Sequence, residues 1–156
     1  MIPERVDRYL KDHQLPFEHT VHPRAVAAQR LAHVEHVPGD RLAKPVVVSL
    51  DGRLALAVVS ASQRVDVEAL RLATGARTAL LAPETAFEGR FAPCEVGAEP
   101  ALGVFGLPIY VDAELAREPW ILMRGGTHED ALKIETASWI AAEHPTPVNG
   151  LGRHLV

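Results

Sequence analysis

Lys44 is the residue of this chain whose type and position are best suited to chemistry on a ligand. It leads directly into the apolar run Val46–Val48, and the chain holds only three lysines among its 16 basic residues. An ammonium beside a buried strand must be paired or must face a cavity or a substrate, so Lys44 is a candidate site residue. The alternative is a strand-end lysine whose stem lies along apolar surface while its charge reaches water.

The glycine-led segment 97–103 is a candidate substrate loop. Glycine permits backbone geometry and close approach that a side chain would block. Exposed amides in such a loop can bind a carbonyl or ribose oxygen, or stabilise a developing oxyanion. The alternative is an ordinary irregular connection. The candidate residues are Gly97, Ala98, Glu99, Pro100 and Gly103.

A second glycine-led turn, Gly125–His128, follows a predicted strand. Its amides can meet a phosphate or a ribose, which makes Gly126, Thr127 and His128 candidate substrate contacts. Thr127 is equally well placed to cap the next turn, and both interpretations stay open.

Other catalytic chemistries have little support in the sequence. Eight histidines are present, but no His-Glu-x-x-His pattern and no cysteine pair supports a metal site, so we expect no metal and no cofactor. No Gly-x-Ser-x-Gly motif marks a serine nucleophile. Cys94, the single cysteine, has no evident activating partner and is better explained as a packing residue.

The elements that must position these residues are mixed irregularly along the chain. A hairpin is predicted from two apolar strands, 46–50 and 54–60, around Asp51-Gly52. Further strands are expected over 15–20, 78–81, 109–112, 120–124 and 132–135, and helices over 3–13, 25–34, 66–74 and 136–143. This order predicts an α+β fold with a mixed, curved β-sheet flanked by helices.

Length and composition limit the class of protein. The 156 residues predict one domain over 1–156, with a loose tail over 145–156 that is rich in proline and glycine. A net charge of -4 argues against a dedicated nucleic-acid coat. We expect a cytoplasmic protein, because no secretory signal, bilayer-length apolar run or cysteine pair is visible.

Several motifs together resemble the YbaK-type aminoacyl-tRNA deacylase family, which is related to the inserted editing domain of bacterial prolyl-tRNA synthetases. In the first half these are His22-Pro23, Ala27–Ala32, His36–Gly39 and Leu42–Val48. In the second half they are Cys94–Gly103, Leu107–Asp112, Gly125–His128 and Ala131–Ile134. The resemblance covers residues 17–142.

The resemblance implies hydrolysis, without a metal, of the ester that joins an amino acid to the 3′ end of a mischarged tRNA. Such editing is needed where a synthetic site cannot reject a near-isostere. Lys44 would be the catalytic side chain, holding the terminal phosphate or the ester. Gly97 and its neighbours would contact the aminoacyl ester through the backbone. The partners would be mischarged tRNA and an aminoacyl-tRNA synthetase, with no membrane and no DNA.

Three residues depart from the family pattern, and they bear on the choice of substrate. They are Pro45, Glu99 and Ala101. Glu99 would either recognise an α-ammonium or point to solvent. Because any phosphate contacts must come from a small basic rim (Lys44, Arg41, Arg64 and Arg124), we expect weak, salt-sensitive tRNA binding. The alternative function is a non-catalytic binding module that uses the same cleft.

Overall fold

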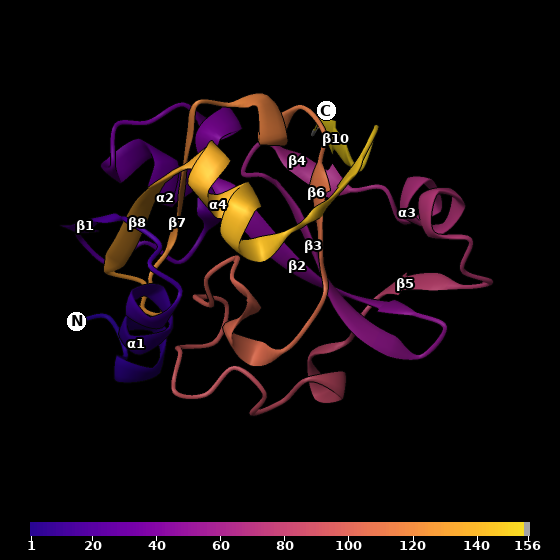
Figure 1. Ribbon diagram of the computed structural model, residues 1–156, viewed down its shortest axis with the longest axis horizontal. Coiled ribbons are helices and arrows are strands. Elements are labelled where there is room, and N and C mark those ends of the chain that lie inside the picture. Colours follow the sequence, from indigo (N-terminus) through magenta and orange to yellow (C-terminus); the bar gives the residue numbers. More distant parts are fainter. Residues whose placement is uncertain (155–156) are drawn as a thin grey trace.

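An antiparallel hairpin lies at the centre of the fold. Strands β2 (Ala43–Leu50) and β3 (Arg53–Ser60) pair along their whole length. Asp51 and Gly52 join them, both with positive φ, as the Asp-Gly signal predicts. The computed structural model describes residues 1–154 and is shown in Figure 1.

The hairpin forms part of a five-stranded sheet with the order β5-β2-β3-β6-β9. The added strands are β5 (Ala79–Leu81), β6 (Ile109–Asp112) and β9 (Thr146–Val148). β5 pairs with β2 antiparallel, whereas β6 and β9 extend the other side of the sheet in parallel. The predicted α+β fold with a mixed sheet is therefore confirmed.

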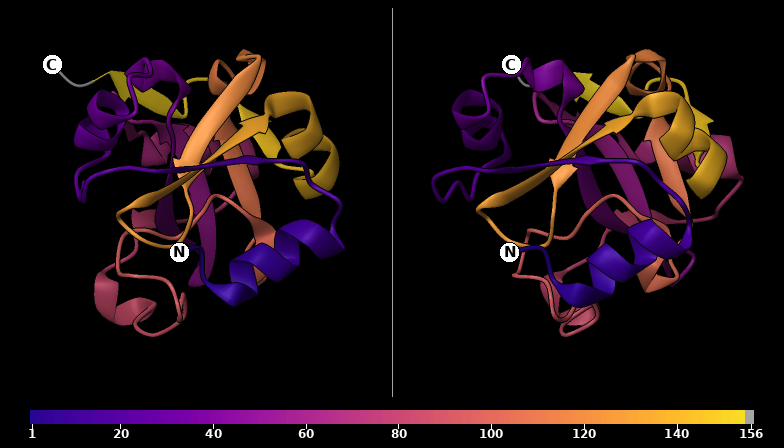
Figure 2. Two further views of the ribbon diagram at one scale, coloured as in Figure 1. Left: turned by 90° about the vertical axis from the view of Figure 1, so that its left-hand side faces the viewer. Right: turned by 60° about the vertical axis from the view of Figure 1, so that its left-hand side comes forward.

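A second, three-stranded sheet consists of β1 (Glu18–Val21), β8 (Asp130–Glu135) and β7 (Trp120–Arg124). Figure 2 shows β7 and β8 in front of the central hairpin. Apolar side chains from both sheets meet in the main core, including Val47 of β2, Met123 of β7 and Leu132 of β8. Burial of this apolar surface is the main force that holds the two sheets together.

Within residues 1–154, four α-helices surround the sheets: α1 (Glu4–Asp12), α2 (Ala28–Val34), α3 (Val67–Thr74) and α4 (Thr136–Glu143). Asp66 caps α3, because its carboxylate accepts the amides of Glu68 and Ala69. Gly75 ends the same helix in the left-handed conformation. Short 3-10 helices lie at Gly39–Arg41, Glu84–Ala86, Gly103–Phe105 and Leu115–Arg117. None of the helices within residues 1–154 is long and apolar enough to cross a membrane.

The expectation of a loose tail over 145–156 is wrong for residues 146–154. β9 pairs with β6, and β10 (Gly152–His154) pairs with β4 (Gln63–Val65), a strand that the sequence did not predict. Val148 and Leu151 are buried in a second core on the α3 side of the central sheet. Local proline and glycine signals could not reveal this order, because it comes from contacts with distant strands. Residues 155–156 lie outside the described residues.

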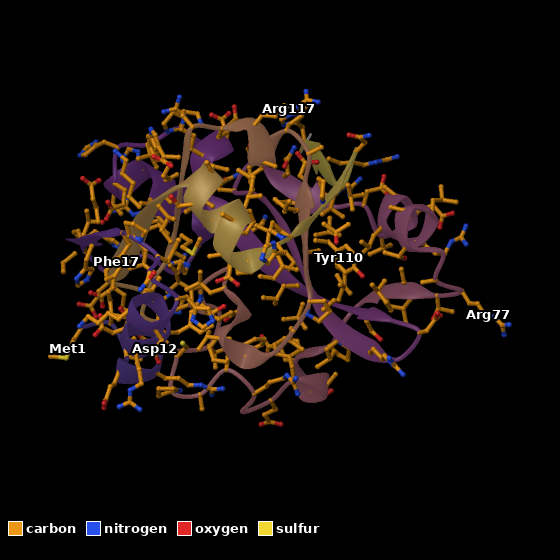
Figure 3. All side chains as sticks on the ribbon, viewed as in Figure 1. Met1, Asp12, Phe17, Arg77, Tyr110 and Arg117 are labelled. Carbon is orange, nitrogen blue, oxygen red and sulfur yellow. The ribbon has the colours of Figure 1, made fainter. Side chains whose placement is uncertain are left out.

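The irregular segment 83–106 lies along one edge of the molecule, between α1 and the tip of the β2–β3 hairpin (Figure 1). This segment contains the predicted substrate loop. Met1 and Arg77 lie toward opposite ends of the long axis (Figure 3).

Candidate active site

Gly97 lines two cavities and is the one residue that their linings share. It is exposed and has a φ of 81°, a conformation that L side chains rarely adopt. With no side chain at this point, a ligand that passes from one cavity to the other can approach the backbone closely.

The larger cavity has a volume of about 280 Å³, which suits a small ligand. Its wall is largely apolar, with Glu99 at the buried side of the lining and Glu84 and Glu88 exposed. The side chains that supply most of the apolar wall are Phe87, Phe91, Cys94 and Val96.

Cys94 belongs to this wall and is not suited to be a nucleophile. Burial, with a smaller contribution from the Glu99 charge, raises the pKa of its thiol to about 11. Because the thiolate is the reactive form, a thiol with this pKa is inert at neutral pH.

The smaller cavity has a volume of about 140 Å³ and carries the positive charge of the site. Lys44 and Arg124 line it together with Gly97. Its apolar wall comes from the α2 region and the start of β2, namely Val26, Ala28, Leu31, Leu42, Ala43 and Pro45. Val26, Ala28 and Leu31 were not predicted to line the site, although two of them lie in the Ala27–Ala32 motif, because alanine-rich helical spacing is also typical of an ordinary core helix.

The half-buried ammonium of Lys44 has a defined partner. Its Nζ donates a hydrogen bond to the carbonyl oxygen of Gln63 in β4, at 2.6 Å. Partial burial lowers the pKa of Lys44 below its ordinary value of 10.5. Lys44 thus does not simply extend to solvent, and an ammonium with one donor engaged retains others for a ligand.

Arg124 is a buried residue of the smaller cavity, which corrects its expected place on an exposed basic rim. Only 6% of it is exposed, and its guanidinium donates to the carbonyls of Ala25 at 2.6 Å and Val26 at 2.5 Å. Burial lowers the pKa of Arg124, while the nearby Glu99 charge raises it. Through these hydrogen bonds, the guanidinium holds the backbone that leads into α2, which forms part of the cavity wall.

Glu99 is also buried, with 7% of its surface exposed, so the solvent-facing one of the two alternatives for this side chain is wrong. Burial raises the pKa of its carboxyl group, and backbone amides of Glu99 and Gly97 oppose that rise. The more distant charges of Arg124 and His128 act in the same direction as the amides. A buried acidic group therefore lines the larger, mainly apolar cavity next to Gly97.

Hydrogen bonds hold the Gly97 loop against the Gly125–His128 turn. Glu95 donates its amide to the carbonyl of Gly126, and Gly126 donates its own to the carbonyl of Ala98, both at 2.9 Å. The Nε2 of His128 lies 2.9 Å from the Val96 carbonyl. Because a carbonyl only accepts, Nε2 carries the hydrogen. The turn positions the loop, but none of its residues lines either cavity.

The other candidate contacts also have structural partners. Thr127 caps the turn, since its Oγ1 accepts the amides of Glu129 and Asp130. Gly103 donates its amide to Glu143 at 2.9 Å, and an added Cβ there would lie 2.8 Å from the same carboxylate. A further group of candidates lines neither cavity, and this geometry gives them a supporting place rather than a ligand contact: Ala98, Pro100, Gly103, Gly126, Thr127 and His128.

The part of the chain that the structure describes, residues 1–154, contains no group of three or more His, Cys, Asp or Glu side chains arranged to hold a metal ion. The chemical resources of the site are thus the two cations of the smaller cavity, the buried carboxylate of the larger one and the exposed backbone of Gly97.

Comparison with protein families identifies the class to which this fold and site belong. The model of the aminoacyl-tRNA editing domain matches residues 22–142. The chain therefore belongs to the aminoacyl-tRNA editing domain family. A search of the curated proteins finds no match.

Solved structures share the fold over almost the whole chain. The hypothetical protein APE2540 has a TM-score of 0.85 at 16% identity, covering 96% of this chain and 100% of its own. A candidate trans-editing enzyme for prolyl-tRNA synthetase has a TM-score of 0.76 at 19% identity, covering 96% and 98%. A structure from computational grafting of epitope backbones onto scaffold proteins has a TM-score of 0.82 at 20% identity, covering 97% and 96%. At these identities the likeness shows the fold alone.

Proposed function

We propose that this protein is a trans-editing deacylase that hydrolyses the ester of a mischarged aminoacyl-tRNA. The observation that carries the proposal is the position of Gly97 between an apolar cavity and a cationic one. An aminoacyl-tRNA end has the same division, since an amino acid and an anionic nucleotide meet at one ester bond. Membership of the editing-domain family supports this assignment.

Each cavity then has a role. The smaller cavity receives the terminal nucleotide, and the Lys44 ammonium holds its phosphate or the ester oxygen. The larger cavity receives the amino acid, and its 280 Å³ volume limits which side chains enter. Gly97 lies at the ester, where any side chain would obstruct the substrate.

The proposed reaction is a hydrolysis by water. Water attacks the acyl carbon, and the bond between that carbon and the ribose oxygen breaks. The hydroxyl of the water remains on the released amino acid, while a proton goes to the ribose oxygen. Lys44 contributes by positioning and charge, which are effective where the site is partly shielded from water. We propose that no metal takes part, so activity should survive EDTA.

The test is single-turnover deacylation of a panel of mischarged tRNAs at high enzyme concentration. Wild-type protein is compared with Lys44→Ala and with Lys11→Ala, which removes an exposed lysine of α1. We expect one or a few esters to be hydrolysed, with loss of activity only in Lys44→Ala. Activity that survives Lys44→Ala at an unchanged rate would contradict the assigned role.

The second candidate function is a non-catalytic module that binds aminoacyl-adenosine-like ligands or a protein partner in the same cleft. The observation that favours it is the commitment of Lys44 to the Gln63 carbonyl. Binding of aminoacyl-tRNA without turnover across the whole panel would support this function and exclude the first.

A further inference from the structure

The carboxylate of Glu99 is the most unusual charge in the larger cavity. The residue is 7% exposed, and the apolar part of the cavity wall that it shares includes Phe87, Phe91 and Cys94. Within residues 1–154, no basic group comes within the 4.0 Å that defines an ion pair with it. Burying a carboxylate without an opposite charge costs free energy. A cationic ligand that pairs with Glu99 would offset part of that cost, which would strengthen its binding.

The two basic residues whose charges act on Glu99 are committed to other partners. The guanidinium of Arg124 donates to the carbonyls of Ala25 and Val26. The Nε2 hydrogen of His128 is used by the carbonyl of Val96. These groups act on Glu99 only through space. A carboxylate can accept several hydrogen bonds, so Glu99 can accept from a cation inside the cavity in addition to the backbone amides of Glu99 and Gly97.

We propose that Glu99 binds the α-ammonium of the amino acid in the larger cavity, so that the substrates are esters with a free α-amino group. This inference rests on the proposed function. It goes beyond it by naming the group that the chain recognises and the residue that recognises it.

The position of Glu99 relative to Gly97 identifies the α-ammonium as the group that is recognised. The two residues are separated by one position, and both line the larger cavity. An ester carbonyl at Gly97 has the α-carbon attached directly to it, so the ammonium falls beside Glu99. The side chain of the amino acid then extends toward Phe87 and Phe91. The exposed Glu84 and Glu88 lie farther out and can attract the cation but cannot desolvate it.

The test compares matched esters that differ only at the α position. The best aminoacyl-tRNA of the panel is converted to its α-hydroxyacyl form, in which a hydroxyl replaces the ammonium without added bulk. Each enzymatic rate is divided by the spontaneous rate of the same ester, because the ammonium also activates the ester chemically. We expect the wild-type kcat/KM, corrected in this way, to fall about 10- to 100-fold on the hydroxy ester.

Two variants assign the effect to Glu99. Glu99→Gln keeps the shape and removes the charge, and it should lower kcat/KM about 10- to 100-fold for the amino ester while leaving the hydroxy ester nearly unchanged. Glu84→Gln removes an exposed carboxylate of the same cavity, and because water screens that charge it should lower the amino-ester rate by a smaller factor than Glu99→Gln does. Melting temperatures show whether each variant is folded.

The outcomes separate this inference from the proposed function. If no ester of the panel is hydrolysed, the proposed function fails first. If esters are hydrolysed and the corrected wild-type kcat/KM is the same for the amino and the hydroxy ester, the α-ammonium inference is overturned. The proposed deacylase function is then still supported. Equal effects of Glu84→Gln and Glu99→Gln would also overturn it, since they would indicate general attraction by negative charge. The wild-type comparison decides the matter even if Glu99→Gln fails to fold.

Discussion

At the scale of single residues, Lys44 is the side chain on which the proposed reaction depends most. Its ammonium is a compact charge on a flexible stem, held 2.6 Å from the Gln63 carbonyl at a cavity of about 140 Å³. A guanidinium at the same place is a wider planar group, which would shift both the charge and the substrate.

We therefore predict that Lys44→Arg is nearly as inactive as Lys44→Ala. Both variants should lower the single-turnover rate by roughly 100-fold or more, because small displacements are costly when catalysis rests on positioning. Neither should unfold the protein, since Lys44 is only half-buried. Recovery of most of the rate by arginine would mean that Lys44 is a diffuse electrostatic contact.

Glu99 gives a prediction about stability. Its pKa is raised above the ordinary value of 4.5, so the folded state holds a proton where the unfolded state has lost it. Stability should then decrease as pH rises from 4.5 to the raised pKa. Glu99→Gln has no ionisable group at this position, so it should not show this loss of stability. Its melting temperature should therefore rise relative to that of the wild type as the pH increases from 4 to 7. A difference that is constant over this range, or one matched by Glu84→Gln, would contradict the assignment.

At the scale of elements, the Gly97 loop is a rigid part of the site rather than a mobile connection. Its backbone is hydrogen-bonded to the Gly125–His128 turn on both sides of Gly97. An added Cβ at Gly97 would meet only His128 Cε1, at 3.8 Å, which is an ordinary contact. The cost to folding of a side chain here thus comes from the backbone conformation rather than from a clash.

We predict that Gly97→Val abolishes deacylation and costs roughly 1–2 kcal/mol of stability through its positive φ. Gly106→Val is a matched control, because Gly106 has a φ of 75°, no atom within 4 Å of an added Cβ, and no place in either cavity lining. It should lose a similar amount of stability and keep its activity. Comparable losses of activity in both variants would make Gly97 a purely structural residue.

At the scale of the whole molecule, an acidic protein must bind an anionic substrate. The net charge is -4, and the expected basic rim is smaller than its sequence suggested. Arg124 is buried, and Arg41 pairs with Glu118 at 3.1 Å and stacks on Trp120. Lys44 and the exposed Arg64 remain the candidates of that rim for contacts with phosphates.

We predict that tRNA binding is weak and that it weakens further with salt. Two phosphate contacts on a single strand give a slope of about −1.4 in log affinity against log salt, or roughly a sevenfold loss between 50 and 200 mM. Fluorescence anisotropy with labelled tRNA would measure it, and Arg64→Ala should roughly halve the slope. Binding that is unchanged over this range would show that phosphates contribute little.

The amino-acid sequence by itself determined the local features of this protein. The Asp51-Gly52 hairpin and the Asp66 cap of α3 are encoded in a few adjacent residues, so turn and cap rules were sufficient to predict them. The ordered motifs of both halves were likewise sufficient for the editing-domain family.

Only the tertiary structure decided how these features combine into a site. β4 supplies the Gln63 carbonyl that accepts from Lys44. Its pairing with β10 joins strands that are far apart in the chain. The burial of Glu99 and of Arg124 depends on what packs over them, which no local pattern records. Gly97 lines two cavities because segments from four regions of the chain converge on it. Such long-range contacts depend on the packing of the whole core, and this is the physical reason why the sequence could propose the site residues but not their arrangement.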